Sequence, residues 1–257
     1  MDLQHATQER TGGSRRGLPN LRRSSFTAFA AGLICQCLLG QESPSLRPVQ
    51  LVVDPVTHLI HVTFKNQSSQ EIVSFSLRAP GNGVGYTHFF PPMTQSLMPG
   101  ATHEELFTQS GDSARESVDN YVVGAVLYRN GDGEGSAVEL ATIDDLRAGR
   151  EAELARTIPV METLSSGADG ALQAGAQQCI TKTAAMRTEV DQVVNRSGAF
   201  VSGMRATIGD LERECREVAR IATNGNLAIA RATLTHRLEQ RKSMLLSVQT
   251  SRLIKRQ

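Results

Sequence analysis

The sequence predicts an α+β protein: an N-terminal immunoglobulin-like antiparallel β-sandwich followed by a separate α-helical hairpin or coiled-coil segment. Apolar and polar residues alternate with a period of two in short runs before residue 141, and apolar residues recur in steps of three and four after it. A basic start followed by an apolar run sets off the N-terminus. The chain therefore divides into a signal peptide with a polar extension (1–43), the sandwich (44–141), a helix and linker (142–170), and a helical hairpin with a basic amphipathic C-terminal helix (171–257).

The first segment has the layout of a secretory signal peptide. Its polar part contains Arg10, Arg15, Arg16, Arg22 and Arg23, and an apolar run extends from Phe26 to Leu39. A run of about 14 residues is too short to cross a bilayer, which takes about 20. We expect cleavage after Gly40 and export to the periplasm or the extracellular space.

Two alternatives stay open for this segment. Ser14-Arg15-Arg16-Gly17-Leu18 resembles a twin-arginine export motif, although it is separated from the apolar run and a second pair, Arg22-Arg23, lies between them. Without export, the polar stretch would be a disordered N-terminus, and the apolar run after it would be a short buried or anchoring helix.

The middle of the chain predicts seven short strands and no long helix. Turn signals separate the strands, among them Asn66–Ser69, Pro80–Gly83 and Pro99-Gly100. The expected strands are Val49–Val53, Leu59–Phe64, Ile72–Leu77, Val84–Phe90, His103–Phe107, Val118–Tyr128 and Val138–Leu140. This number of strands in about a hundred residues is typical of an immunoglobulin-like sandwich.

Two local features carry a resemblance. They are the turn Leu97-Met98-Pro99-Gly100, and the strand Val122–Tyr128 that runs into Asn130-Gly131-Asp132-Gly133-Glu134-Gly135. With these features the segment resembles the small sandwich domains of uncharacterised exported bacterial proteins. The resemblance covers under half of the chain, and it implies a fold but no activity.

Beyond the Ser165–Gly170 linker, two apolar stripes have helix-to-helix spacing and mirror each other about Ser197. Folding back at Asn195–Gly198 would therefore set each stripe residue opposite one of the other stripe, and Cys179 opposite Cys215. The stripes are Leu172, Ala176, Cys179, Thr183, Met186, Val190 and Val193, and Val201, Met204, Ile208, Leu211, Cys215, Val218 and Ala222. Because these are the two cysteines left after signal cleavage, we predict a disulfide between them in an oxidising compartment.

Two alternatives stay open for the stripes. One continuous helix could cross a second copy of itself antiparallel about Ser197, which would make the protein self-associate through its helices. Alternatively, Cys179 and Cys215 are buried free thiols, which small helical cores often contain.

A further helix follows the break at Asn224-Gly225-Asn226, with a basic surface beside an apolar side. Its apolar side is Leu227, Leu234, Leu238, Leu245 and Val248, and its basic residues, the candidates for binding an anionic partner, are Arg231, Arg237, Arg241, Lys242 and Arg252. Such a helix either joins a bundle with a solvated basic face or lies on an anionic membrane or polymer. We favour the bundle.

Candidate chemistry is sparse in the remaining residues. Asn130, Asp132 and Glu134 space their oxygens as the first half of a calcium loop does, but Ala141 stands at the twelfth position, so we favour a turn without metal. Gly111-Asp112-Ser113 lacks the strand-to-helix context of a nucleophilic serine. His58 and His61, three apart in an expected strand, would face opposite sides.

These observations favour an exported, non-catalytic interaction or structural protein of the cell envelope. We expect no cofactor, and the net charge of +1 predicts no general nucleic-acid binding. The expected partner is an envelope component or another protein. The alternative is a hydrolase or metal-dependent enzyme that works from the sandwich loops.

Overall fold

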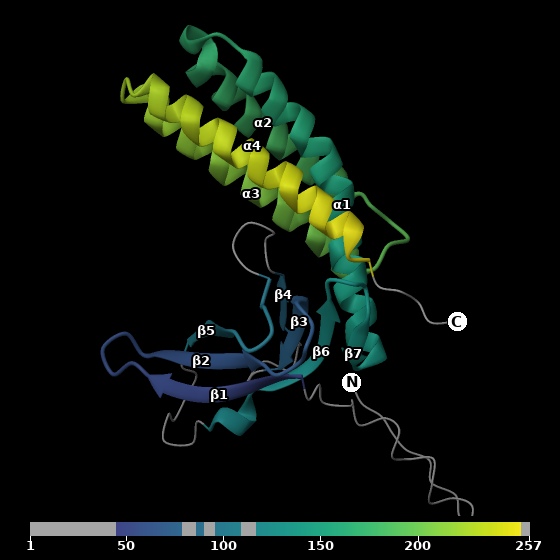
Figure 1. Cartoon of the computed structure of the whole chain (residues 1–257). Coiled ribbons are helices and arrows are strands. Elements are labelled where there is room, and N and C mark those ends of the chain that lie inside the picture. Colours follow the sequence, from purple (N-terminus) through teal and green to yellow (C-terminus); the bar gives the residue numbers. More distant parts are fainter. Residues whose placement is uncertain (1–44, 79–85, 90–95, 109–116, 253–257) are drawn as a thin grey trace, which may run out of the picture. The chain divides into compact units, whose positions relative to one another are not determined.

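A computed structural model of the chain describes residues 45–78, 86–89, 96–108 and 117–252. Within these residues the fold is mixed, as predicted: two small antiparallel sheets precede four α-helices (Figure 1). The strands are β1 (Leu46–Val53), β2 (Leu59–Asn66), β3 (Ile72–Arg78), β4 (Tyr86–Phe89), β5 (Thr102–Thr108), β6 (Val122–Tyr128) and β7 (Gly133–Gly135). The helices are α1 (Ala137–Ser166), α2 (Leu172–Asp191), α3 (Gly198–Thr223) and α4 (Leu227–Thr250). The expected signal peptide and Gly111-Asp112-Ser113 lie outside the described residues.

The strands form a three-stranded sheet in the order β1-β2-β5 and a four-stranded sheet in the order β4-β3-β6-β7. The two sheets share one apolar core, to which β2 contributes alternate residues, as its period-two pattern predicted. The rings of Phe64 on β2 and Phe75 on β3 lie 5.9 Å apart in this core. The other buried members of the core are Leu46, Ile60, Val62, Ile72, Leu77, Leu97, Tyr121, Val123, Val126 and Tyr128.

The other face of the four-stranded sheet is covered by the start of α1. Val73, Ala125 and Leu127 pack against Ile143 in a second, smaller core, so β3 and β6 are buried on both faces. Glu139 joins helix and sheet by polar contacts, because its carboxylate accepts hydrogen bonds from the Ser76 hydroxyl and the Arg78 guanidinium.

The prediction of a strand at Val138–Leu140 is wrong, because these residues form the first turn of α1. The closing strand is β7, which pairs with β6 directly before the helix. Leu140 and Ile143 are three residues apart and both contact the sheet, a spacing that fits one face of a helix. The helix then continues through the exposed Pro159 to Ser166 and spans about 45 Å.

Helices α2 and α3 run antiparallel, because Cys179 contacts Cys215 while Asp191, further along α2, contacts Arg205, earlier in α3. Every predicted stripe residue of the two helices is buried or packs against the helical core. The alternative of one continuous helix is not what the structure has. The chain breaks between the helices, where Asn195 has a φ of 65° and the Ser197 hydroxyl caps α3.

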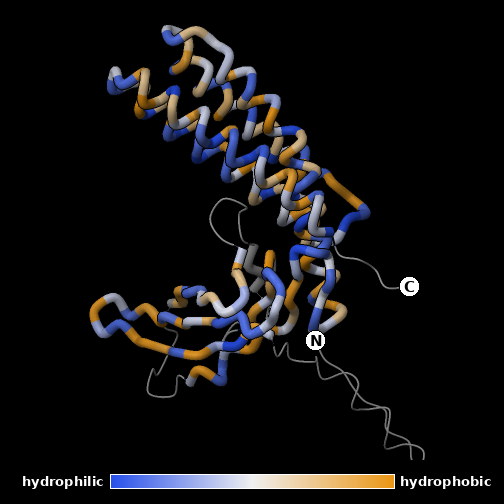
Figure 2. The backbone as a smooth tube through the Cα atoms, in the orientation of Figure 1, coloured by the Kyte–Doolittle hydropathy of each residue, from blue (hydrophilic) through white to orange (hydrophobic). Residues whose placement is uncertain are grey.

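The predicted apolar side of α4 is confirmed. Leu234, Leu238 and Val248 are buried, and Leu227 and Leu245 pack against the helical core. Figure 2 shows apolar and polar segments alternating along the helices, as expected when each helix presents one side to its neighbours.

Helices α1 and α3 approach each other at the level of the backbone. A Cβ atom added at Gly149 would lie 2.0 Å from the carbonyl oxygen of Phe200, and one added at Gly203 would lie 2.1 Å from that of Leu146. Both glycines are buried. No side chain can yield to relieve these contacts, so the crossing requires glycine on both helices.

We therefore expect Gly203→Ala to lower the free energy of unfolding by about 1–3 kcal/mol, the usual cost of overpacking a core. Gly209→Ala is the matched control on the same helix, because its added Cβ would meet nothing closer than the Arg187 guanidinium at 3.8 Å. Alanine there should stabilise the protein by about 0.5–1 kcal/mol through helix propensity. Urea unfolding of both variants measures the difference, and equal effects would contradict the close crossing.

Candidate functional site

The predicted disulfide is present. Cys179 and Cys215 are bonded, with their Cα atoms 6.2 Å apart, and both side chains are buried in the helical core. The bond closes a loop with a sequence separation of 36 residues. The chain-entropy model assigns such a loop a stabilisation of about 3–4 kcal/mol.

The loop considered for calcium uses its oxygens to hold its own turn. Asn130 Nδ2 donates to Asp132 Oδ2 at 2.8 Å, and the Asp132 backbone N–H donates to Asn130 Oδ1 at 3.0 Å. Glu134 points elsewhere and accepts from the Tyr128 hydroxyl at 2.5 Å and from the Ser45 hydroxyl. Burial and this carboxylate raise the pKa of Tyr128 to about 12. Among the described residues, no group of three or more His, Cys, Asp and Glu side chains is placed to hold a metal ion.

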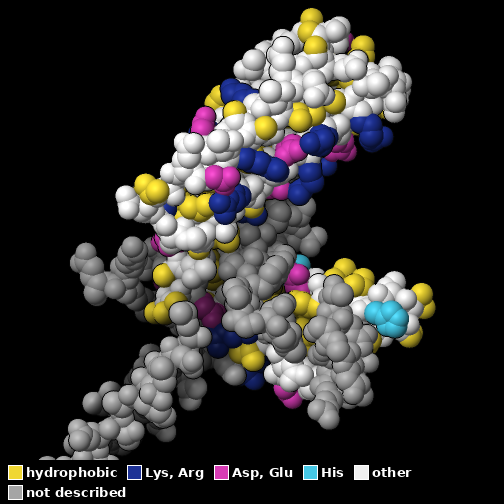
Figure 3. Space-filling model, turned by 180° about the vertical axis from the view of Figure 1, so that it is seen from behind, with side chains coloured by type: hydrophobic (Ala, Val, Ile, Leu, Met, Phe, Trp, Pro, Cys, Tyr) yellow, Lys and Arg dark blue, Asp and Glu magenta, His cyan; other side chains and the backbone are white. Residues whose placement is uncertain are grey.

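The five basic residues proposed for an anionic partner are all engaged within the chain. Each contacts a carboxylate on another element: Arg231 with Asp169 (2.7 Å), Arg237 with Glu217 (3.2 Å), Arg241 with Glu214 (2.7 Å), Lys242 with Glu162 (3.0 Å) and Arg252 with Glu151. Figure 3 shows acidic and basic side chains interspersed over the helical part. These contacts therefore hold α4 and Arg252 beyond it against α1, α3 and the segment that follows α1, which fits the bundle interpretation of this helix.

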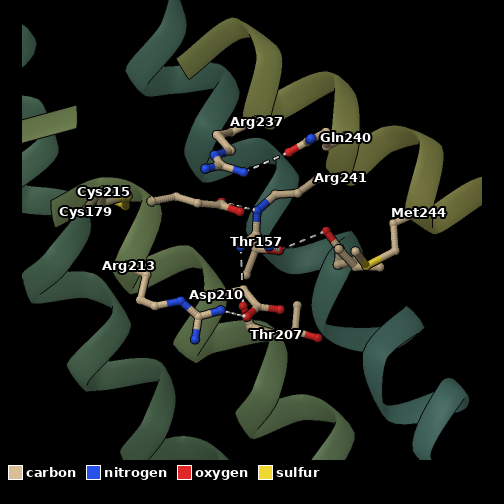
Figure 4. A network of polar contacts seen from close by, with 12 residues as sticks. Thr157, Cys179, Thr207, Asp210, Arg213, Cys215, Arg237, Gln240, Arg241 and Met244 are labelled. Carbon is tan, nitrogen blue, oxygen red and sulfur yellow. Dashed lines mark hydrogen bonds and ion pairs between the residues drawn. A yellow bond between two sulfur atoms is a disulfide. The ribbon is translucent and has the colours of Figure 1, made fainter. Parts of the chain in front are cut away.

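Arg241 is not part of the surface of α4, contrary to the sequence prediction. It is 3 % exposed and points between α1 and α3 (Figure 4). Its Nη1 donates to the Thr157 hydroxyl at 3.0 Å, and its Nε donates to Glu214 at 2.7 Å. Burial raises the pKa of Glu214, although Arg241 lowers it. The spacing contained a signal, because Arg241 follows Leu238 by three residues on the apolar side of the helix.

Two more charged residues are buried on α1, and sequence reasoning missed both. Arg147 is 2 % exposed and donates to the Ser251 hydroxyl at 2.9 Å, and burial lowers its pKa to about 10. Glu153 is fully buried and accepts from Arg156 at 3.1 Å, and burial raises its pKa more than Arg156 lowers it. Arg147, Arg150, Leu154 and Thr157 follow the three-and-four spacing of a buried stripe, which could have identified Arg147.

The histidines do not form a shared site in the described part of the chain. His58 lies in the turn before β2 with a φ of 55°, not in a strand, while His61 lies on β2. His103 points toward the core side of β5, with its Nε2 atom 2.7 Å from Glu105 and its ring against the ring of Phe75. The side chain of His88 lies outside the described residues.

The outer face of the three-stranded sheet is the candidate interaction surface. The strand register places Val52, His61 and Leu106 in one row across β1, β2 and β5. Val52 is 48 % exposed and Leu106 is 55 % exposed, and between them His61 Nδ1 lies 2.7 Å from Glu104. No described element covers this face, whereas α1 covers the outer face of the other sheet.

The hairpin between β1 and β2 extends this apolar surface. Its tip presents Val56, which is 84 % exposed. Asp54 holds the tip, because its carboxylate accepts from the Val56 backbone N–H at 2.8 Å and from the Thr57 hydroxyl at 2.6 Å. The Thr57 hydroxyl and the backbone N–H groups lower the pKa of Asp54. We define the outer-face patch as Val52 and Leu106 with the His61–Glu104 pair and Val56 at the hairpin tip.

Comparisons of the chain with protein-family models, with curated proteins and with solved structures found no match. None of the described helices is both long and apolar enough to cross a membrane.

We expect Cys179→Ser to lower the free energy of unfolding by about 3–4 kcal/mol, because the unfolded chain regains the freedom that the bond removes. Cys215→Ser should have the same effect, and the double variant should lose little more than either single variant, since one bond is lost in each case. Urea unfolding without reductant measures the three values. A double variant that loses the sum of both effects would show that the cysteines act independently.

A second prediction concerns the buried Glu153 carboxyl. In the unfolded chain it ionises at its ordinary pKa, but in the folded protein only at a higher pH. Ionisation therefore lowers the free energy of unfolding as the pH rises through the folded-state pKa. Glutamine cannot ionise, so Glu153→Gln should gain stability relative to the natural chain between about pH 4 and about pH 7. Urea unfolding at both pH values measures this gain, and a difference independent of pH would contradict it.

Proposed function

We propose that this chain is an exported, non-catalytic interaction protein of the cell envelope, in which an immunoglobulin-like sandwich binds a protein partner and a disulfide-bonded helical hairpin supports it. The outer-face patch carries this proposal. Scattered exposed apolar residues are normal on a protein surface, whereas neighbouring ones on one face mark interaction sites. Val52 and Leu106 belong to a single row of this face.

The strand order supports the immunoglobulin-like assignment. The chain crosses between the sheets more than once, since β1 and β2 share one sheet, β3 and β4 lie in the other, β5 returns to pair with β2, and β6 pairs with β3. Such crossings between two antiparallel sheets with a common core are the connections of a Greek-key sandwich.

The disulfide supports export. Disulfides persist in oxidising compartments such as the periplasm and the extracellular space, and they are rare in the reducing cytosol. The bond also joins the first half of α2 covalently to the second half of α3, which supports the description of this part as a hairpin.

The charges around the patch define the chemistry of the partner. Glu104 is an exposed carboxylate beside the apolar row, and Lys65 is an exposed cation two rows further along β2. A matching protein surface has an apolar centre, a cation placed against Glu104 and a carboxylate placed against Lys65. Charges at the rim set orientation and association rate, while the apolar centre supplies affinity.

Site-specific photo-crosslinking in a bacterial host that exports the protein to its envelope tests this proposal. A photoreactive amino acid at Val52 or Leu106 should give one adduct of a defined mass with an envelope protein. The same amino acid at Val194, which is 76 % exposed in the break between α2 and α3, is the matched control and should give none. Adducts of the same mass from all three positions, or from none, would contradict partner binding by the sheet face.

The mass of the purified protein tests export in the same experiment. The exported chain should begin near Gln41 and be about 2 Da lighter than its reduced form, because two hydrogens are lost when the disulfide forms. A chain that keeps its N-terminus and has Cys179 and Cys215 as free thiols would exclude export.

A further inference from the structure

A groove between α1 and α2 has the features of a small-molecule site. It encloses a cavity of about 270 Å³ near the end of α1 and the start of α2. Its apolar lining includes Val160 and Leu164 from α1 and Leu172 and Cys179 from α2. All four residues are at most 9 % exposed in the helical core. The groove is separate from the outer-face patch, which lies on the sheet.

The groove exists because α2 packs mainly against α3. The disulfide and the Arg187–Glu212 ion pair both join α2 to α3. On the α1 side, Gly175 lets the Leu164 side chain lie directly against the α2 backbone, because a Cβ atom added at Gly175 would lie 2.8 Å from that side chain. The apolar residues that line the groove are therefore held in place because α2 is fixed to α3.

One cation lies at the rim of this groove. Lys182 lines the cavity and is exposed, and no carboxylate of the described residues forms an ion pair with it. The five basic residues of the C-terminal helix region, by contrast, each contact a carboxylate. Thr163 also lines the cavity, but its hydroxyl donates to the Pro159 carbonyl at 2.9 Å. The rim thus offers one positive charge that the fold has not used.

We propose that this groove binds a small anionic amphiphile, a free carboxylate whose apolar chain lies on the helical core and whose carboxylate pairs with Lys182. Ligand sites are mostly apolar clefts with a few placed polar groups, and drug-sized ligands fill about 300–1,000 Å³. The cavity lies just below that range, so it fits a single medium-length chain. Because the groove carries one cation, a monoanion complements it better than a neutral or cationic molecule.

Isothermal titration of the full exported chain with decanoate, kept below its micelle concentration, tests the proposal. Decanol is the matched neutral probe. The natural protein should bind decanoate more tightly than decanol. Lys182→Gln should weaken decanoate binding roughly two- to fivefold, the effect of one exposed ion pair, and leave decanol binding unchanged. Arg213→Gln, which removes the same charge from an exposed side chain of α3 that does not line the cavity, should change neither.

A second pair of variants places the ligand in the groove. Thr163→Trp should block decanoate, because Thr163 lines the cavity, whereas Gln177→Trp is the control on α2, since Gln177 is exposed and does not line it. Gln178→Trp replaces the first variant if that variant does not fold. Equal affinity for decanoate and decanol, an unchanged affinity in Lys182→Gln, or binding that survives the groove tryptophans would each overturn the proposal.

Vesicles distinguish the free acid from a membrane lipid. Co-sedimentation with phosphatidylglycerol vesicles that depends on Lys182, in the absence of decanoate binding, would assign the groove to a lipid chain and overturn the proposal of a free carboxylate.

Discussion

The close crossing of α1 and α3 is the constraint on which the rest of the helical part depends. Gly149 and Gly203 let the two backbones meet where any side chain would collide with a carbonyl oxygen. This crossing fixes α1 and α3 relative to each other, and α2 and α4 both pack against α3. The first turns of α1 cover the four-stranded sheet, and its later turns pack in the helical core. The crossing with α3 therefore fixes the helix that contributes residues to both cores.

Buried charges add a second constraint on the register of these helices. Arg241 reaches Glu214 on α3 and Thr157 on α1, and Arg147 reaches the end of α4 at Ser251. A charge away from water is tolerated when its partners are in place, and leaving it unpaired costs several kcal/mol. A slip of one turn between helices would separate these groups, so the network favours one arrangement over other packings of the same apolar stripes.

The two sheets differ in what their outer faces contact, and the proposed function depends on that difference. The outer residues of β3 and β6 are buried under α1, whereas those of β1 and β5 stay exposed. Sequence alternation identified the strands but not this distinction, because an apolar residue on the outer face looks the same whether a helix covers it or not. The placement of α1, with Glu139 bound to Ser76 and Arg78, decides which outer face a described helix covers.

The sequence by itself determined the helices and strands that a repeating pattern of apolar residues specifies. The period of two identified β1 to β6, and the mirrored stripes identified α2, α3 and the pairing of Cys179 with Cys215. It misplaced Val138–Leu140 as a strand, because three residues are too few to distinguish a period of two from a helical period. Their conformation is decided by the contact of Ile143, later in the same helix, with the sheet. It also placed Arg241 on the surface, because charged residues are usually exposed. Only tertiary structure decided that Arg241 meets Glu214 and Thr157, that two glycines meet at a crossing, and that Lys182 borders a cavity. Each of these depends on residues far away in the chain, whose distances no local pattern encodes.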